Sequence, residues 1–265
     1  MSAGHDEVKH PYHLVEPSIW PLLSAFAGGL FATGMVLFMH DVTPWILPLG
    51  VLSILICMFG WWREVVDEAY RQQLYNPVVR IGLRYGMILF IASEVMFFFA
   101  FFWAFFDASL FPKEAIGFVW PPEDIVTFNA FDLPFLNTLI LLLSGCTVTW
   151  AHHAILHDDQ KSAVQALTYT VVLGIAFSGL QAYEYSHAAF GFTDGIYAST
   201  FYMATGFHGF HVLVGTIFLF VCLQRAKKGH FTPDAHVGFE AAAWYWHFVD
   251  VVWLFLFFAV YWWGG

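Results

Sequence analysis

Residues 239–265 read FEAAAWYWHFVDVVWLFLFFAVYWWGG, and this stretch decides what kind of protein the chain forms. Its length suits a membrane crossing, because a hydrocarbon core of ~30 Å needs about 20 helical residues. Yet Glu240, His247 and Asp250 lie within it or at its edge. An unpaired charge inside a bilayer costs ~2.5 kcal/mol or more, so these groups must face protein, water or one another. The stretch therefore predicts one helix of a larger polytopic assembly.

The whole chain has the composition of a membrane protein. Of its 265 residues, 59% are hydrophobic and only 11% are charged, whereas a soluble domain carries about 25% charged residues. The three cysteines (Cys57, Cys146 and Cys222) lie far apart inside apolar runs and form no CxxC pair. This spacing argues against a disulfide framework or a thiolate metal site, and predicts small buried apolar side chains instead.

Seven apolar runs are long enough to cross a membrane. They cover residues 18–40, 45–62, 82–106, 133–156, 163–185, 195–224 and 239–263. Backbone polar groups in lipid must be hydrogen-bonded internally, and the period-2 alternation of a membrane β-barrel is absent. We therefore expect an all-α polytopic membrane protein with seven transmembrane helices.

The basic residues predict the orientation of these helices. Nine of the ten Lys and Arg residues fall on the N-terminal side of the membrane, and only Lys113 falls on the other. By the positive-inside rule, the N-terminus lies in the cytoplasm or its mitochondrial equivalent and the C-terminus lies outside. On the inner side, the charged segment 63–79 favours a helix until Asn76-Pro77, which predicts an interfacial or extended cytoplasmic helix.

Glu94 is the sharpest single feature, because it lies in the middle of the third apolar run. Burial in lipid disfavours the charged form of a carboxyl group. We therefore expect Glu94 to be protonated at neutral pH unless a partner or water stabilises the anion. Its role is either a proton relay or a neutral hydrogen bond to another helix, and the residues alone leave both open.

Two functional alternatives use other polar residues of the apolar runs. His208 and His211 are three residues apart, hence on one helix face, and with His247 they are candidate ligands of a stand-alone haem or metal oxidoreductase. Glu94, Glu184 and Asp250 are candidates for a proton-coupled transporter. Against both, structural hydrogen bonds between helices are the commoner role of such residues, and corresponding Gly/Pro-broken helices are absent.

Residues at the inner ends of two apolar runs suggest contacts with lipid headgroups. The second run ends in Trp61-Trp62-Arg63-Glu64, and the sixth is followed by Arg225-Ala226-Lys227-Lys228. Basic side chains near an anionic membrane surface bind phosphate with about 1 kcal/mol each. Six of the thirteen histidines also fall on the inner side, where they are solvated interfacial residues or a proton-collecting surface. These six are His5, His10, His13, His152, His153 and His157.

Several longer motifs together resemble subunit III of the haem-copper (aa3-type) cytochrome c oxidases. They are WWREV (61–65), GLRYGMILFIASEV (82–95), WPP (120–122), TWAHH (149–153), ATGFHGFH (204–211) and the whole of 238–257, with PSIWP (17–21) in the first run. The resemblance covers essentially the full chain. It implies seven helices split into a pair and a group of five around a lipid-filled cleft. The corresponding divisions are 1–62, a cytoplasmic connecting segment 63–81, and a five-helix bundle 82–265.

The resemblance also implies the function. Subunit III is part of an oxygen-reducing, proton-pumping enzyme but has no catalytic residue, haem, copper or other metal site of its own. It packs on subunit I, with subunit II and small subunits in the same complex, and the haem and copper belong to those partners. It binds membrane phospholipid, protects the enzyme during turnover and supports proton uptake at the inner face. Nucleic acid is not among its partners.

The family's site residues can be placed on this sequence. Its buried carboxyl of the third helix matches Glu94, and its lipid headgroup contacts match Trp61, Arg63 and Glu64, with Arg225 and Lys228 as basic counterparts. Seven runs favour a cytochrome c oxidase over its quinol-oxidase relatives. The long charged N-terminal tail favours a bacterial inner (plasma) membrane, with the mitochondrial inner membrane as the alternative.

Overall fold

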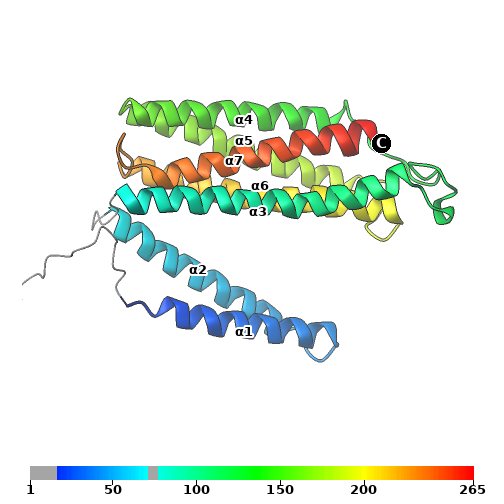
Figure 1. Cartoon of the computed structure of the whole chain (residues 1–265), viewed down its shortest axis with the longest axis horizontal. Coiled ribbons are helices and arrows are strands. Elements are labelled where there is room, and N and C mark those ends of the chain that lie inside the picture. The colour runs from blue at the N-terminus through cyan, green and yellow to red at the C-terminus, as the bar shows by residue number, and fades with distance from the viewer. Residues whose placement is uncertain (1–16, 71–76) are drawn as a thin grey trace, which may run out of the picture. The chain divides into compact units, whose positions relative to one another are not determined.

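The computed structural model describes residues 17–70 and 77–265 of the chain. Seven helices in these ranges are long and apolar enough to cross a membrane, which confirms the all-α membrane fold (Figure 1). They are α1 (Trp20–Met39), α2 (Ile46–Tyr70), α3 (Pro77–Leu110), α4 (Leu133–Leu156), α5 (Gln160–Ser186), α6 (Ile196–Lys227) and α7 (Val237–Leu256). A π-helical segment, η2 (Phe257–Trp263), continues α7, and a short 3₁₀ turn, η1 (Glu114–Ile116), lies between α3 and α4.

The helices extend furthest beyond the apolar runs at the junction between the second and third runs. Of the predicted connecting segment 63–81, the residues up to Tyr70 continue α2, and those from Pro77 begin α3. Proline suits the first position of a helix, because its missing N–H has no partner within the helix there. Arg71 and Asn76 of this segment lie outside the described residues, as do Lys9, His5, His10 and His13 of the tail.

The described residues divide at Gly82 into two compact units. In the first unit, α1 and α2 pack through glycines. A Cβ atom on Gly34 would lie 2.7 Å from the backbone of Leu47, and one on Gly50 would lie 2.6 Å from the backbone of Phe31. Any larger residue at these positions would force the two backbones apart. Close approach through small residues is a common way for helices to associate in lipid.

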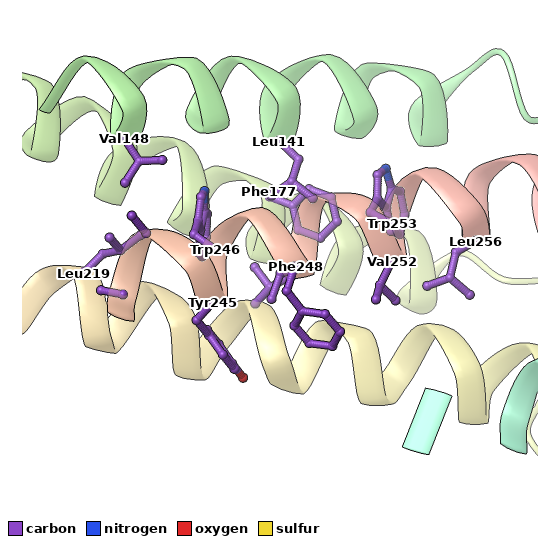
Figure 2. Close-up of a cluster of buried hydrophobic side chains, with 14 of the residues drawn as sticks. Leu141, Val148, Phe177, Leu219, Tyr245, Trp246, Phe248, Val252, Trp253 and Leu256 are labelled. Atoms are coloured by element: carbon purple, nitrogen blue, oxygen red, sulfur yellow. The ribbon is translucent and has the colours of Figure 1, made fainter. Parts of the chain in front are cut away.

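The second unit is organised around α7, which is the most deeply buried of its helices. Figure 2 shows Trp246 and Trp253 on the side of α7 that faces α4, and Tyr245 and Phe248 on the side that faces α6. The indole N–H of Trp246 donates to Ser144 Oγ at 2.8 Å, and that of Trp253 donates to Thr138 Oγ1 at 2.9 Å. The four aromatic residues fill the centre of the bundle, and the two tryptophans also hydrogen-bond α7 to α4.

Hydrogen bonds in the connecting segments fix the ends of the helices of this unit. The carboxylate of Asp159 accepts the backbone N–H of Ser162 at 3.0 Å and caps the start of α5. The hydrogen bonds from Ser162 hold the pKa of the Asp159 carboxyl below its usual value. Beyond α3, the indole N–H of Trp120 donates to the carbonyl of Gly264 at 3.1 Å and ties the connecting loop to the C-terminus.

The cysteine prediction holds at two of three positions. Cys57 and Cys222 are buried, whereas Cys146 is exposed. The expectation of burial is wrong at Cys146 because apolar character does not distinguish a core-facing position from a lipid-facing one on the same helix.

Candidate functional site

Glu94 lies on α3 and pairs with a histidine of α6. Its Oε2 atom is 2.9 Å from Nε2 of His211. The other ring nitrogen of His211, Nδ1, is 2.6 Å from the carbonyl oxygen of Phe207 in the same helix. The His211 ring also lies against Phe98, Tyr245 and Phe248, so that the pair is surrounded by aromatic rings.

This arrangement places one proton between Glu94 and His211. A carbonyl oxygen only accepts, so Nδ1 of His211 must carry the proton that it donates to Phe207. If the imidazole is neutral, Nε2 is an acceptor and Glu94 must be the protonated donor. If Glu94 is ionised, His211 must be the cation. The pair has zero net charge in either form, which lowers the cost of its partial burial, because the His211 side chain is 8% exposed and that of Glu94 is 21% exposed. His211 is therefore the hydrogen-bond partner of Glu94 and links α6 to α3.

The three histidines of the alternative redox site have separate partners. Nε2 of His208 is 3.1 Å from the carbonyl of Val249, and His211 pairs with Glu94. His247 faces α4, where its Nε2 is 3.2 Å from Thr149 Oγ1. His208 and His211 lie three residues apart on α6, but their rings contact different helices. His208 contacts α7, and His211 contacts α3. In the described part of the chain, these three residues do not form one ligand group.

The three carboxyls of the alternative transporter site are also engaged separately. Glu94 pairs with His211, and Glu184 accepts the hydroxyl of Tyr261 at 2.7 Å. Asp250 lies on α7 with its Oδ2 atom 3.5 Å from Nδ1 of His247. Among the described residues, each of the three carboxyls thus has a different partner.

The first group of candidate lipid contacts lies on α2. Trp61 is 38% exposed, and Trp62 and Arg63 are exposed as well. Trp61 and Trp62 line a shallow hollow against α1 that includes Ser24 and Cys57. Glu64 differs from these residues, because its carboxylate accepts the hydroxyl of Ser18 at 2.7 Å and so links the end of α2 to the start of α1.

The second group lies at the end of α6. Lys228 is exposed, as is its neighbour Lys227. The Arg225 guanidinium lies 4.6 Å from the centre of the Phe231 ring, which is a cation–π distance. Arg225 therefore has a contact within the protein, whereas the two lysines present their charges to the surroundings.

A polar cluster that the sequence analysis missed ties α3 to α7. Arg84 donates from Nε and Nη2 to the two carboxylate oxygens of Glu240, at 2.7 and 2.8 Å. His236 is 3.3 Å from the same carboxylate, and its ring lies against that of His152 on α4. The local signal was present, because His236 and Glu240 have i,i+4 spacing at a helix start. The pairing with Arg84 spans 156 residues and has no local signal.

Comparisons with known proteins identify the family. The family described as cytochrome c oxidase subunit III matches over residues 10–265. Similar proteins, each named cytochrome c oxidase subunit 3, come from Prototheca wickerhamii, Arabidopsis thaliana and Struthio camelus. They are 57%, 56% and 53% identical to this chain, and each comparison covers 97% of the chain and 99%, 98% and 98% of the relative. This chain belongs to the cytochrome c oxidase subunit III family.

Proposed function

We propose that the chain is a non-catalytic core subunit that packs on the catalytic subunit I of an oxygen-reducing, proton-pumping oxidase. Subunit II and small subunits are further members of the proposed complex, and the haem and copper belong to the partners. The observation that carries this proposal is the family match over residues 10–265. The separate partners of His208, His211 and His247 support it, because these three histidines do not converge on one ligand position.

The proposal predicts a protective role that can be measured. Selective removal of this chain from the purified oxidase should leave the initial rate of oxygen reduction largely intact. The enzyme should then lose activity after fewer turnovers than the intact complex, and adding the chain back should restore its lifetime. A depleted enzyme that lasts as long as the intact complex would remove the protective role.

The second part of the proposal is phospholipid binding at the headgroup level. Exposed aromatic and basic residues in the second half of α2 and just after α6 support it, namely Trp61, Arg63 and Lys228. Glu64 and Arg225 also have contacts within the protein, with Ser18 and Phe231, so substitutions there mix two effects. The cleaner test is Lys227→Ala with Lys228→Ala, which should lower the phospholipid phosphorus that copurifies with the complex and speed inactivation. Lys113→Ala is the matched control on the opposite side, and unchanged lipid content in the double variant would remove this part.

The third part is support of proton uptake at the inner face. The Glu94–His211 pair supports it, because the proton can pass between the carboxyl and the imidazole without a change in the net charge of the pair. Infrared difference spectra of the intact complex test the pair directly. A protonated-carboxyl band that disappears in Glu94→Gln and shifts in His211→Gln would establish the shared proton. The same protonated-carboxyl band in wild type and Glu94→Gln would show that Glu94 does not carry the proton.

The proposed orientation places the N-terminus on the cytoplasmic or matrix side and the C-terminus outside. The membrane is a bacterial plasma membrane in this proposal, with the mitochondrial inner membrane as the alternative. Cysteine substitutions at Lys228 and Lys113 test the orientation in sealed vesicles, since an impermeant thiol reagent should reach them from opposite sides. Labelling of both from the same side would contradict the seven-crossing topology.

A further inference from the structure

Three side chains meet where α4 ends and α7 begins. His152 lies in the last turns of α4, His236 precedes α7, and Glu240 lies in the first turn of α7. Each offers one possible ligand atom, and these atoms all lie within 4.8 Å of one another. His236 and Glu240 are 7% and 9% exposed, so that two of the three residues are more than nine-tenths buried. We call these three residues the α4–α7 cluster.

The hydrogen bonds of His236 leave an unshared electron pair inside this cluster. Nδ1 of His236 is 2.9 Å from the carbonyl of Thr232 and must be the donor there. In the neutral ring, Nε2 is then an acceptor. It has no hydrogen-bond partner, although Oε1 of Glu240 lies 3.3 Å away. Nε2 of His152 is also buried without a hydrogen-bond partner. The electron pairs of His236 Nε2 and Glu240 Oε1 therefore face one another, and Nε2 of His152 adds a third in the tautomer whose proton is on Nδ1.

Nε2 of His236 and Oε1 of Glu240 are 3.3 Å apart, and Nε2 of His236 has no other partner among the described residues. Two ligands at ~2.05 Å from a tetrahedral zinc ion lie about 3.3 Å apart. Two imidazole nitrogens and one carboxylate oxygen are a common protein ligand set for zinc, with water in the fourth position.

The surrounding contacts are those that orient metal ligands. Metal-binding histidines usually donate their second N–H to a backbone carbonyl, as His236 does to Thr232. Ligating carboxylates are held by further hydrogen bonds, as Glu240 is by Arg84. Each carboxylate oxygen has two lone pairs, so Oε1 keeps one for a metal after it accepts the Arg84 N–H. The positive charge of Arg84 weakens cation binding, so we expect the zinc occupancy of the site to vary with the free zinc concentration.

We propose that His152, His236 and Glu240 form a binding site for a divalent zinc ion that links the end of α4 to the start of α7. The ion would have no redox role in this position. It would hold two helices together at the end of the bundle where Arg84 also joins α3 to α7.

The decisive experiment locates zinc in the intact oxidase complex. Crystals of the complex are soaked in Zn²⁺, and diffraction data are collected just above and just below the zinc absorption edge, which separates zinc from the copper of the complex. The expected result is an anomalous peak among the three side chains. The absence of a peak there at a saturating zinc concentration would overturn the proposal, and this test needs no variant.

Binding measurements with matched variants give the second readout. Loss of an outer-shell contact alone weakens metal binding roughly 10–100-fold, so loss of a ligand should weaken it at least as much. His236→Gln and His152→Gln should each remove one zinc equivalent per complex at a concentration that fills the wild-type site. His153→Gln is the control, since His153 is the exposed neighbour of His152. Equal zinc content in all four proteins would contradict the assignment.

Discussion

In the first unit, the buried residues of α1 and α2 are small, namely Ala27, Gly34, Gly50 and Cys57. In the second unit, α7 buries Trp246 and Trp253 completely or nearly so, together with the ionisable Glu240 and Asp250. The buried share of the membrane-spanning stretch is 11% in α1 and in α2, but 61% in α7. Both units have comparably apolar helices, so composition does not explain the difference.

The comparison shows two ways to hold helices together in lipid. Lipid tails are as apolar as leucine, so hydrophobicity alone does not drive helices together there. The first unit relies on close backbone contact at glycines. The second relies on large interlocking aromatic rings and on hydrogen bonds such as those from Trp246 to Ser144 and from Tyr261 to Glu184. The second arrangement also brings polar side chains of different helices together, as in the candidate Glu94–His211 pair.

The largest effect should come from removing an aromatic ring from the second unit. Trp246→Ala leaves a cavity where a fully buried indole fills the bundle and also removes the bond to Ser144. We expect a loss of about 3–5 kcal/mol in the free energy of unfolding. The measurement is an SDS titration of the full chain in mixed micelles. Trp103→Ala is the control, because Trp103 is 66% exposed. Equal losses in both variants would mean that the core does not depend on this ring.

A smaller effect should come from adding one methyl group to the first unit. A Cβ on Gly34 would meet the backbone of Leu47 at 2.7 Å, whereas one on Gly28 has nothing within 4 Å. Gly34→Ala should therefore cost about 1–3 kcal/mol, as overpacking typically does. Gly28→Ala should be neutral or slightly stabilising, because alanine favours a helix by up to ~1 kcal/mol. Crosslinking between cysteines placed on α1 and α2 would report the separation of the two helices. Identical crosslinking in both variants would contradict close packing at Gly34.

The smallest effect should come from a single buried hydrogen bond of the second unit. Tyr261→Phe removes the hydroxyl that Glu184 accepts. Hydrogen bonds between membrane helices average ~0.6 kcal/mol and reach about 1.7 kcal/mol, so we expect a loss in this range. Tyr183→Phe is the matched control, since the Tyr183 side chain is 56% exposed. A loss as large as that of Trp246→Ala would indicate that polar contacts, and not packing, stabilise the bundle.

The sequence predicted the fold well because a helix that crosses a membrane must be long and apolar. Such runs are visible directly in the hydropathy of the sequence. All seven spans were found, and the ends differ mainly where α2 and α3 continue into polar sequence. Glu94 was found for the same reason, as a carboxyl where the membrane penalises charge. The family was identified from its motifs.

The partners of the polar residues could not be predicted in the same way. Glu94 and His211 are 117 residues apart, and Arg84 and Glu240 are 156 apart. Which helices are neighbours depends on packing, and the apolar runs contain little information about it. His208 and His211 illustrate the limit, because residues three apart share a helix face yet point about 60° apart around the axis. That difference sends His208 to α7 and His211 to α3.

The central claim is that this chain has no redox centre and acts through its partners. The most direct measurement is the absorption spectrum of each fraction after the chain is removed from the oxidase complex in mild detergent. The account predicts that all haem absorbance stays with the remaining subunits and that the separated chain is colourless. Haem absorbance in the separated chain, lost on substitution of His208, His211 or His247, would contradict it.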